Sequence, residues 1–162
     1  MKKSGLLWVL FILLAFLPGC GDAPAPARRE PERGGAPARQ PVNGEVLFRL
    51  PGLDGREVTV RGPTALFFFT SWCAYCKQVM PDVKRLADQA HRQGWRVYGI
   101  NVSESADKAQ WFVQNYQTNF PVLLDQSGRV ADQFGLVGFP TFILLDQNGR
   151  TIYDGHTIPQ NF

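Results

Sequence analysis

The sequence has few of the residues that bind metals or cross-link small folds. It contains three cysteines and two histidines among 162 residues. A structural zinc site usually takes four ligands, and residues 45–162 offer only Cys73, Cys76, His91 and His156. His91 would lie about 22 Å from Cys76 along a straight helix, at 1.5 Å per residue. We therefore expect no metal site, and we expect both histidines at the surface.

Two further absences narrow the class of protein. The lysines and arginines of residues 45–162 are balanced by aspartates and glutamates and form no concentrated basic stretch, so no nucleic-acid partner is expected. The longest apolar run, residues 6–17, is shorter than the span of about 20 residues that a membrane-crossing helix needs.

Because this run of apolar residues follows Lys2 and Lys3 and stops at Pro18, it is typical of a secretory signal. An uncleaved short membrane anchor is the alternative, and both take the chain out of the cytoplasm.

The third cysteine, Cys20, needs a role of its own in an exported chain with an odd cysteine count. Residues 17–20, Leu-Pro-Gly-Cys, resemble a bacterial lipobox, in which cleavage exposes the cysteine for attachment of a lipid. We expect residues 1–20 to form a lipoprotein-type signal peptide, with Cys20 as lipid anchor on the extracytoplasmic face of a bacterial membrane. Pro18 is unusual at its position. Ordinary signal cleavage, with Cys20 discarded or left free, is the alternative.

Residues 21–44 and residues 45–162 differ sharply in composition. The first segment is rich in Pro, Ala, Gly and Arg without apolar periodicity, which predicts a flexible tether. The second has the size of one domain, and its strand-like and helix-like patterns alternate, which predicts an α/β layered sheet. Strands are expected at residues 47–50, 58–60, 65–69, 96–102, 121–124, 142–145 and 151–153. Helices are expected at residues 74–94 with a kink at Pro81, from Ser105 to Tyr116, and at residues 131–134.

Cys73 and Cys76 stand where the apolar run at residues 65–69 gives way to a helical pattern. Unpaired backbone N–H groups and the positive end of a helix dipole favour a thiolate at such a place. Cys73 is therefore expected to act as a nucleophile near neutral pH. Cys76, about one turn away, can resolve the mixed disulfide that Cys73 forms. This arrangement predicts a redox enzyme.

The residues around the two cysteines resemble the thioredoxin superfamily. The resemblance is carried by residues 72–77 (Trp-Cys-Ala-Tyr-Cys-Lys), by Pro81, and by residues 138–141 (Gly-Phe-Pro-Thr), which look like that superfamily's cis-proline loop. The leading hairpin and the exported start are similar to the membrane-tethered TlpA/ResA-like thiol–disulfide oxidoreductases. The resemblance implies a thioredoxin-like α/β fold, with a central mixed β-sheet flanked by helices and an N-terminal β-hairpin extension.

The same resemblance implies roles for individual residues. Cys73 would be the exposed attacking thiol and Cys76 the buried resolving thiol. Pro140, if its peptide bond is cis, would place the backbone beside Cys73 where a substrate strand can pair with it. The residues expected to bind substrate or to tune the redox potential are Trp72, Ala74, Tyr75, Phe139 and Pro140.

The activity that the resemblance implies is exchange of a Cys73–Cys76 dithiol or disulfide with protein substrates. No dissociable cofactor is expected, because electrons arrive through the thiols of a membrane redox partner. We expect a monomeric net reductase that serves apocytochrome thiols in cytochrome c maturation. The direction depends on the redox potential, and a disulfide-forming oxidase is the main alternative.

Two other functions compete with this one. Thr70 precedes Cys73 by three residues, as in the T-x-x-C pattern of peroxiredoxins, which suggests a thiol peroxidase. Against it, Leu66 stands where that family has a proline, and Cys76 is too close for that family's resolving cysteine. The non-enzymatic alternative is a tethered binding module with a structural disulfide, although so short a loop gains little from closure.

Three features depart from the pattern of the superfamily. Phe67 occupies the place of thioredoxin's buried aspartate, and Ala74 the place of a glutamate found in some ResA-like proteins. The usual proton acceptor for the buried thiol is therefore missing from both positions. The chain also stops soon after Tyr153, without the helix that commonly closes such domains. Either one face of the sheet is less covered than usual, or the sequence is incomplete.

Overall fold

A computed structural model describes residues 46–160. The signal peptide, Cys20 and the tether expected from the sequence lie outside these residues. The described chain forms a five-stranded mixed sheet of order β5-β4-β3-β6-β7 and a separate antiparallel pair, β1-β2. The strands are β1 (Phe48–Pro51), β2 (Glu57–Val60), β3 (Thr64–Phe69), β4 (Arg96–Val102), β5 (Val122–Asp125), β6 (Thr141–Leu145) and β7 (Thr151–Gly155). The helices are α1 (Ala74–Gln78), α2 (Met80–Arg92), α3 (Ala106–Tyr116) and α4 (Arg129–Gln133). This confirms the predicted fold class.

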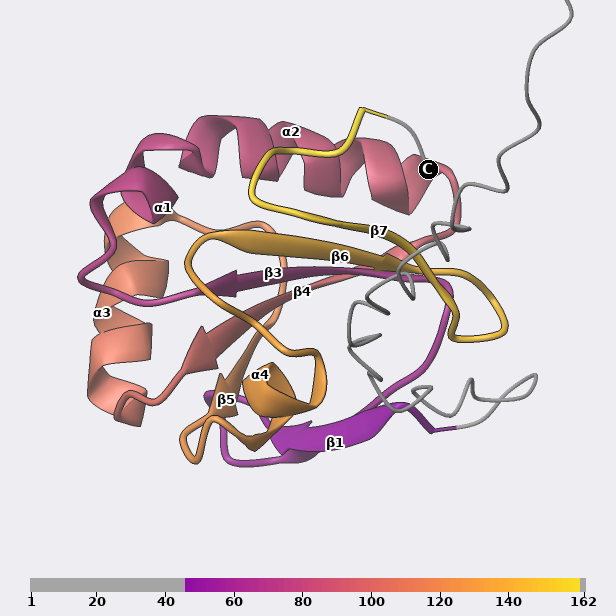
Figure 1. Cartoon of the computed structure of the whole chain (residues 1–162). Coiled ribbons are helices and arrows are strands. Elements are labelled where there is room, and N and C mark those ends of the chain that lie inside the picture. Colours follow the sequence, from indigo (N-terminus) through magenta and orange to yellow (C-terminus); the bar gives the residue numbers. More distant parts are fainter. Residues whose placement is uncertain (1–45, 161–162) are drawn as a thin grey trace, which may run out of the picture. The chain divides into compact units, whose positions relative to one another are not determined.

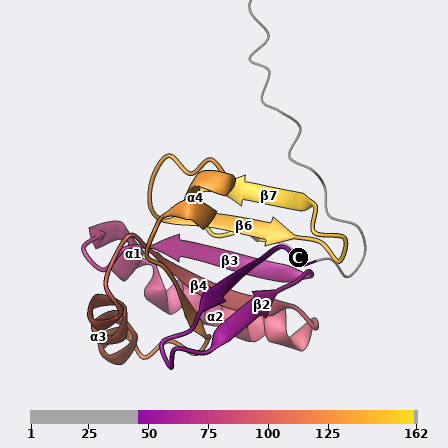
Figure 2. The same cartoon turned by 90° about the horizontal axis from the view of Figure 1, so that it is seen from below.

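The central strand β3 divides the core into two layers. It pairs in parallel with β4 and antiparallel with β6, and all six of its residues are buried. Because side chains alternate along a strand, Phe67 and Phe69 join a cluster under α2 and α3. Leu66 and Phe68 join a second cluster under the β1-β2 hairpin and α4. Figures 1 and 2 show α2 on one side of the sheet and the hairpin with α4 on the other.

Residues 74–94 form two helices, not the single kinked helix that the sequence pattern predicts. α1 ends at Gln78 and α2 begins at Met80, with Val79 as the cap between them. Pro81 lies in the first turn of α2, where its missing N–H leaves no hydrogen bond unmade. Inside a continuous helix, Pro81 would lack that bond and clash with the carbonyl of Lys77. The helix therefore restarts at the proline.

The segment after β7 packs against α2 without forming a helix among the described residues. Ile158 packs on the core cluster that includes α2, and Pro159 is buried. Residues 158–160 line a hollow together with residues of α2, and Figure 1 shows this segment running beside that helix. An extended segment thus covers part of this face. Among residues 46–160, no helix combines the length and the apolarity needed to span a bilayer.

Candidate active site

Cys73 and Cys76 form a disulfide just beyond the carboxyl end of β3. Cys73 is the N-cap residue of α1, and its sulfur accepts a hydrogen bond from the backbone N–H of Cys76 at 3.0 Å. The N–H of Cys73 in turn donates to the carbonyl of Thr70 at 3.2 Å. A tight turn therefore carries the chain from the buried strand directly into the cysteine motif.

The two cysteines differ in how far they are covered. Cys73 keeps 6% of its surface accessible and Cys76 keeps none. Cys73 is more covered than the exposed thiol that the family resemblance implies. The surface of the pair that a partner can reach nevertheless belongs to Cys73.

The cysteine segment and the loop before β6 carry apolar side chains that are exposed or half-buried. We call Trp72, Tyr75, Val137 and Phe139 the apolar rim. Trp72 is 68% exposed, Tyr75 48% and Val137 91%, and the ring of Phe139 meets that of Trp72 edge to face at 6.4 Å. Residues 70–76 and 134–141 include no charged side chain. The approach to Cys73 is therefore apolar and uncharged in both segments.

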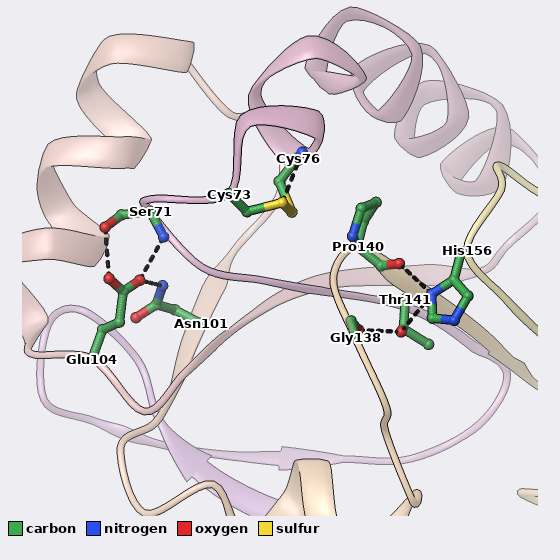
Figure 3. Close-up of a disulfide and its surroundings, with 9 residues drawn as sticks. All are labelled: Ser71, Cys73, Cys76, Asn101, Glu104, Gly138, Pro140, Thr141 and His156. Atoms are coloured by element: carbon green, nitrogen blue, oxygen red, sulfur yellow. Dashed lines mark hydrogen bonds between the residues drawn. A yellow bond between two sulfur atoms is a disulfide. The ribbon is translucent and has the colours of Figure 1, made fainter.

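The loop before β6 forms the other half of the site. Its Phe139–Pro140 peptide bond is cis. Because Thr141, the first residue of β6, pairs with Phe68 of β3, this loop lies beside the strand end that leads to the cysteines. Figure 3 shows Pro140 facing the disulfide. The hydroxyl of Thr141 donates to the carbonyl of Gly138 at 2.7 Å, which ties the loop to the strand.

A buried carboxylate holds the segment that precedes the cysteines. Glu104 is only 7% exposed, and its carboxylate accepts hydrogen bonds from the N–H (2.5 Å) and the hydroxyl (2.6 Å) of Ser71. It also accepts one from the side-chain amide of Asn101 at 2.8 Å. Three donors satisfy a charge that would otherwise be costly to bury. Ser103, just before Glu104, has a φ of 54°, a conformation that costs a serine energy.

The sequence patterns did not identify Glu104, Ser71 or Asn101 as parts of the site. One signal was available, because Ser71 and Glu104 each follow a strand of the predicted sheet. β3 and β4 are parallel neighbours, with Phe69 opposite Asn101, so the segments that follow them meet at one edge of the sheet. That pairing comes from the fold, since 33 positions separate Ser71 from Glu104.

Phe67 and Ala74, at the two positions where the resemblance would place an acid, carry no polar side chain. Phe67 is buried in the same core cluster as Cys76, and its ring stacks on those of Phe69 and Phe142, both at 5.2 Å. Ala74 is exposed at the start of α1. The buried carboxylate of Glu104 is engaged by Ser71 and Asn101.

The two histidines lie in different parts of the described structure. Within residues 46–160, no three side chains of His, Cys, Asp or Glu converge as metal ligands. His91 is exposed on α2. His156 is also exposed, but its ring nitrogen Nδ1 lies 2.8 Å from the carbonyl oxygen of Pro140.

Comparison with known proteins points to a redox family. A sequence model described as the AhpC/TSA family matches residues 46–153. The thiol-disulfide oxidoreductase ResA of Geobacillus thermodenitrificans (strain NG80-2) is 31% identical over 106 residues, which are 65% of this chain and 61% of that protein. The thiol-disulfide oxidoreductase ResA of Bacillus thuringiensis subsp. konkukian (strain 97-27) is 25% identical over 158 residues, which are 95% of this chain and 89% of that protein. The aligned part therefore spans less than two thirds of the first relative and most of the second.

Solved structures agree on the fold. The crystal structure of StoA from Bacillus subtilis is similar with a TM-score of 0.59 and 23% sequence identity, over 67% of this chain and 86% of that chain. At this identity the similarity concerns the arrangement of the strands and helices.

Proposed function

This chain belongs to the AhpC/TSA family, and we propose that it is an extracytoplasmic thiol–disulfide oxidoreductase acting on protein substrates. The observation that carries the proposal is the Cys73–Cys76 disulfide between the end of β3 and the start of α1, facing the loop with cis-Pro140. Relatives named thiol-disulfide oxidoreductase support it. No dissociable cofactor is needed, because the two thiols carry the electrons.

Exchange in the reducing direction takes two displacement steps. The Cys73 thiolate attacks one sulfur of a substrate disulfide, and the other substrate sulfur leaves as a thiolate that takes up a proton. Cys76 then attacks the Cys73 sulfur, which breaks the mixed disulfide and releases the second substrate thiol. Two electrons have passed to the substrate, and the Cys73–Cys76 disulfide remains. Access assigns the order, because only Cys73 has surface that a partner can reach.

The loop and the apolar rim supply the binding surface for the substrate. Pro140 faces the disulfide (Figure 3), and the backbone next to it can pair with an extended segment of the substrate. Trp72 and Tyr75 offer exposed aromatic area to the side chains of that segment. Ala74, between the cysteines, leaves room for close approach. An extended, apolar polypeptide segment is the substrate that this surface fits.

The cellular role that we propose is that of a reductase in cytochrome c maturation. In the full chain, Cys20 anchors the protein by a lipid to the extracytoplasmic face of a bacterial membrane, and residues 21–44 tether the domain. A membrane partner re-reduces the Cys73–Cys76 disulfide, and the protein works as a monomer. The export-like N-terminus and the ResA relatives support this role. The intact mass of protein extracted from membranes tests the anchor, since a lipid on Cys20 adds a defined mass.

Trapping a substrate tests the activity directly. Replacing Cys76 by Ser removes the resolving thiol, so the mixed disulfide on Cys73 should accumulate and dissociate on reduction. The paired variant Cys73→Ser should trap nothing and retain the fold. Trapping through Cys76 in the Cys73→Ser variant, or full activity of that variant, would contradict the assignment.

The redox potential of the pair tests the direction. A potential of about −270 to −200 mV, the range of thioredoxin and glutaredoxins, agrees with a reductase. A potential near about −120 mV, that of a strong disulfide donor, would replace the reductase by the oxidase alternative.

One observation keeps a thiol peroxidase as a second candidate. The hydroxyl of Thr70 is buried without a hydrogen-bond partner among the described residues, three positions before Cys73. Stopped-flow mixing of the reduced protein with hydrogen peroxide separates the two functions. Slow consumption, unchanged in Thr70→Val, agrees with the exchange activity. Rapid consumption that Thr70→Val abolishes would show a peroxidase.

A further inference from the structure

One imidazole ring lies against the end of the loop that faces the disulfide, next to the start of β6. His156 comes just after β7, and its Nδ1 lies 2.8 Å from the carbonyl oxygen of Pro140 and 3.3 Å from the hydroxyl of Thr141. Gly138 is also close to the ring, since a Cβ atom at that residue would lie 3.8 Å from Cε1. Figure 3 shows the ring on the side of Pro140 that faces away from the cysteines. A residue 16 positions away in the sequence thus supports the loop.

The partners of Nδ1 determine which nitrogen of the His156 ring carries the hydrogen. The carbonyl of Pro140 can only accept a hydrogen bond, and the single hydroxyl hydrogen of Thr141 is donated to the carbonyl of Gly138. Both oxygens near the ring are therefore acceptors, and Nδ1 must carry the hydrogen. Protonation of the ring adds a hydrogen at Nε2. The hydrogen bond to Pro140 is consequently present in both protonation states.

The backbone that carries His156 is fixed on both sides. Before it, Gly155 pairs with Phe142 of β6. After it, the hydroxyl of Tyr153 donates to the carbonyl of Thr157 at 2.7 Å. The ring is thus held against the loop before any substrate arrives, which limits the entropy lost on binding.

We propose that His156 is a positioning residue for protein substrates, an inference that rests on the proposed function. His156 holds the carbonyl of Pro140, and Thr141 holds the carbonyl of Gly138. Phe139 lies between these two fixed carbonyls, so its own backbone groups keep the orientation that an incoming substrate strand meets. His156 acts through this loop and makes no hydrogen bond to either cysteine. It therefore affects the binding of a protein strand and leaves the exchange of the disulfide with a small thiol unchanged.

Steady-state reduction of insulin disulfides by the full chain, with dithiothreitol as electron donor, tests this proposal. His156→Ala should raise KM for insulin about three- to tenfold, the effect of one ordinary hydrogen bond. Its kcat and its direct reaction with dithiothreitol should stay within about twofold of the wild type. His156→Asn should restore KM, because its amide N–H stands near the place of the Nδ1 hydrogen. His91→Ala, which removes the exposed histidine of α2, is the matched control and should behave as the wild type.

Several outcomes would overturn the proposal. They are an unchanged KM in His156→Ala, an equal loss in His156→Asn, or an altered reaction of His156→Ala with dithiothreitol. Nitrogen-15 NMR of the wild-type imidazole is a readout that does not depend on activity, and it should show hydrogen on Nδ1 in the neutral ring. A neutral ring with hydrogen on Nε2 alone would exclude the bond to Pro140. A wild type that cannot reduce insulin while its NMR spectrum shows the Nδ1 hydrogen would count against the proposed function and not against the contact.

Discussion

The carboxylate of Glu104 binds the segment that leads into the cysteine motif through Ser71. Its two partners, Ser71 and Asn101, are neutral. The N–H and the hydroxyl of Ser71 and the side-chain amide of Asn101 each donate a hydrogen bond to a carboxylate oxygen. The backbone N–H of Ser71 would otherwise have to find another partner near a buried strand end. Glu104 thus fixes the backbone two residues before Cys73 without touching either sulfur by a hydrogen bond.

Replacing Glu104 by Gln should therefore destabilise the domain. The amide oxygen can still accept from the N–H of Ser71, and the hydroxyl of Ser71 can turn to accept from the amide N–H, but three charge-assisted hydrogen bonds become weaker neutral ones. The expected loss in free energy of unfolding is about 1–3 kcal/mol, measured by urea unfolding of the oxidised protein. Glu57→Gln is the control, because Glu57 is an exposed residue of β2 whose ion pair with Arg49 is also exposed; its loss should stay below about 1 kcal/mol. Equal stability of the wild type and Glu104→Gln would contradict this role.

Single residues of the site could be predicted only where a local pattern identifies them. The spacing of Cys73 and Cys76, and the Gly-Phe-Pro-Thr run that contains Pro140, are visible in short stretches of sequence. Glu104 and His156 carry no such pattern, since their importance comes from partners 33 and 16 positions away. An exposed histidine and a buried glutamate are brought to the site by the pairing of strands.

At the scale of elements, the turn between β6 and β7 shows why the hairpin could be predicted. Asp146 accepts hydrogen bonds from the N–H groups of Asn148 (2.8 Å) and Arg150 (2.9 Å), and Gly149 adopts a φ of 74°, which favours glycine. These contacts lie within five residues, so the turn is encoded locally. Strands β3, β5 and β6 were predicted for a similarly local reason, because each is a short, largely apolar run. The break between α1 and α2 was missed because a proline can either bend a helix or begin one.

The same turn predicts a dependence of stability on pH. The pKa of Asp146 lies below its ordinary value of 3.8, chiefly because the N–H of Arg150 donates a hydrogen bond to the carboxylate. The N–H of Asn148 and the guanidinium of Arg150 lower the pKa further, whereas burial raises it. A pKa lowered in the folded state means that the ionised form stabilises the fold. This contribution is present above the ordinary pKa and is lost as the pH falls through the lowered value.

Asp146→Asn should therefore be less stable than the wild type at neutral pH. The difference in free energy of unfolding between the two proteins should stay constant down to about pH 3.8. It should shrink below that pH, because the wild-type carboxylate becomes protonated and no longer stabilises the fold. Urea unfolding of both proteins across this pH range measures the difference. Asp154→Asn, at an exposed position of β7, controls for the removal of one negative charge. A difference that widens on acidification would refute the assignment.

At the scale of the whole domain, the surface around the disulfide differs from the rest in charge. Acidic and basic residues are balanced over residues 45–162, yet none lies in the two segments that supply the apolar rim. The nearest cation along the chain, Lys77, lies over the ring of Trp111 at 5.7 Å from its centre. Long-range attraction of charged partners is therefore a minor part of the encounter with a substrate.

KM for a protein substrate should accordingly change less than about twofold between 50 and 500 mM salt, because added salt screens only charged contacts. Introducing a charge by Val137→Asp, at a residue that is 91% exposed, should raise KM and make it depend on salt. Insulin reduction at several ionic strengths measures both effects. A steep dependence on salt in the wild type would show that charged residues outside the rim guide the substrate.

The pairing of β3 with β6 brings Cys73 and Pro140 together from distant parts of the chain. Cys73 and Cys76, in contrast, are only three positions apart and stay neighbours even in a denatured chain, because closing so short a loop costs little entropy. A denatured protein can therefore still gain and lose the disulfide, but it has no loop with which to distinguish one partner from another. The ability to close the disulfide comes from four consecutive residues, whereas the ability to distinguish between partners comes from the fold.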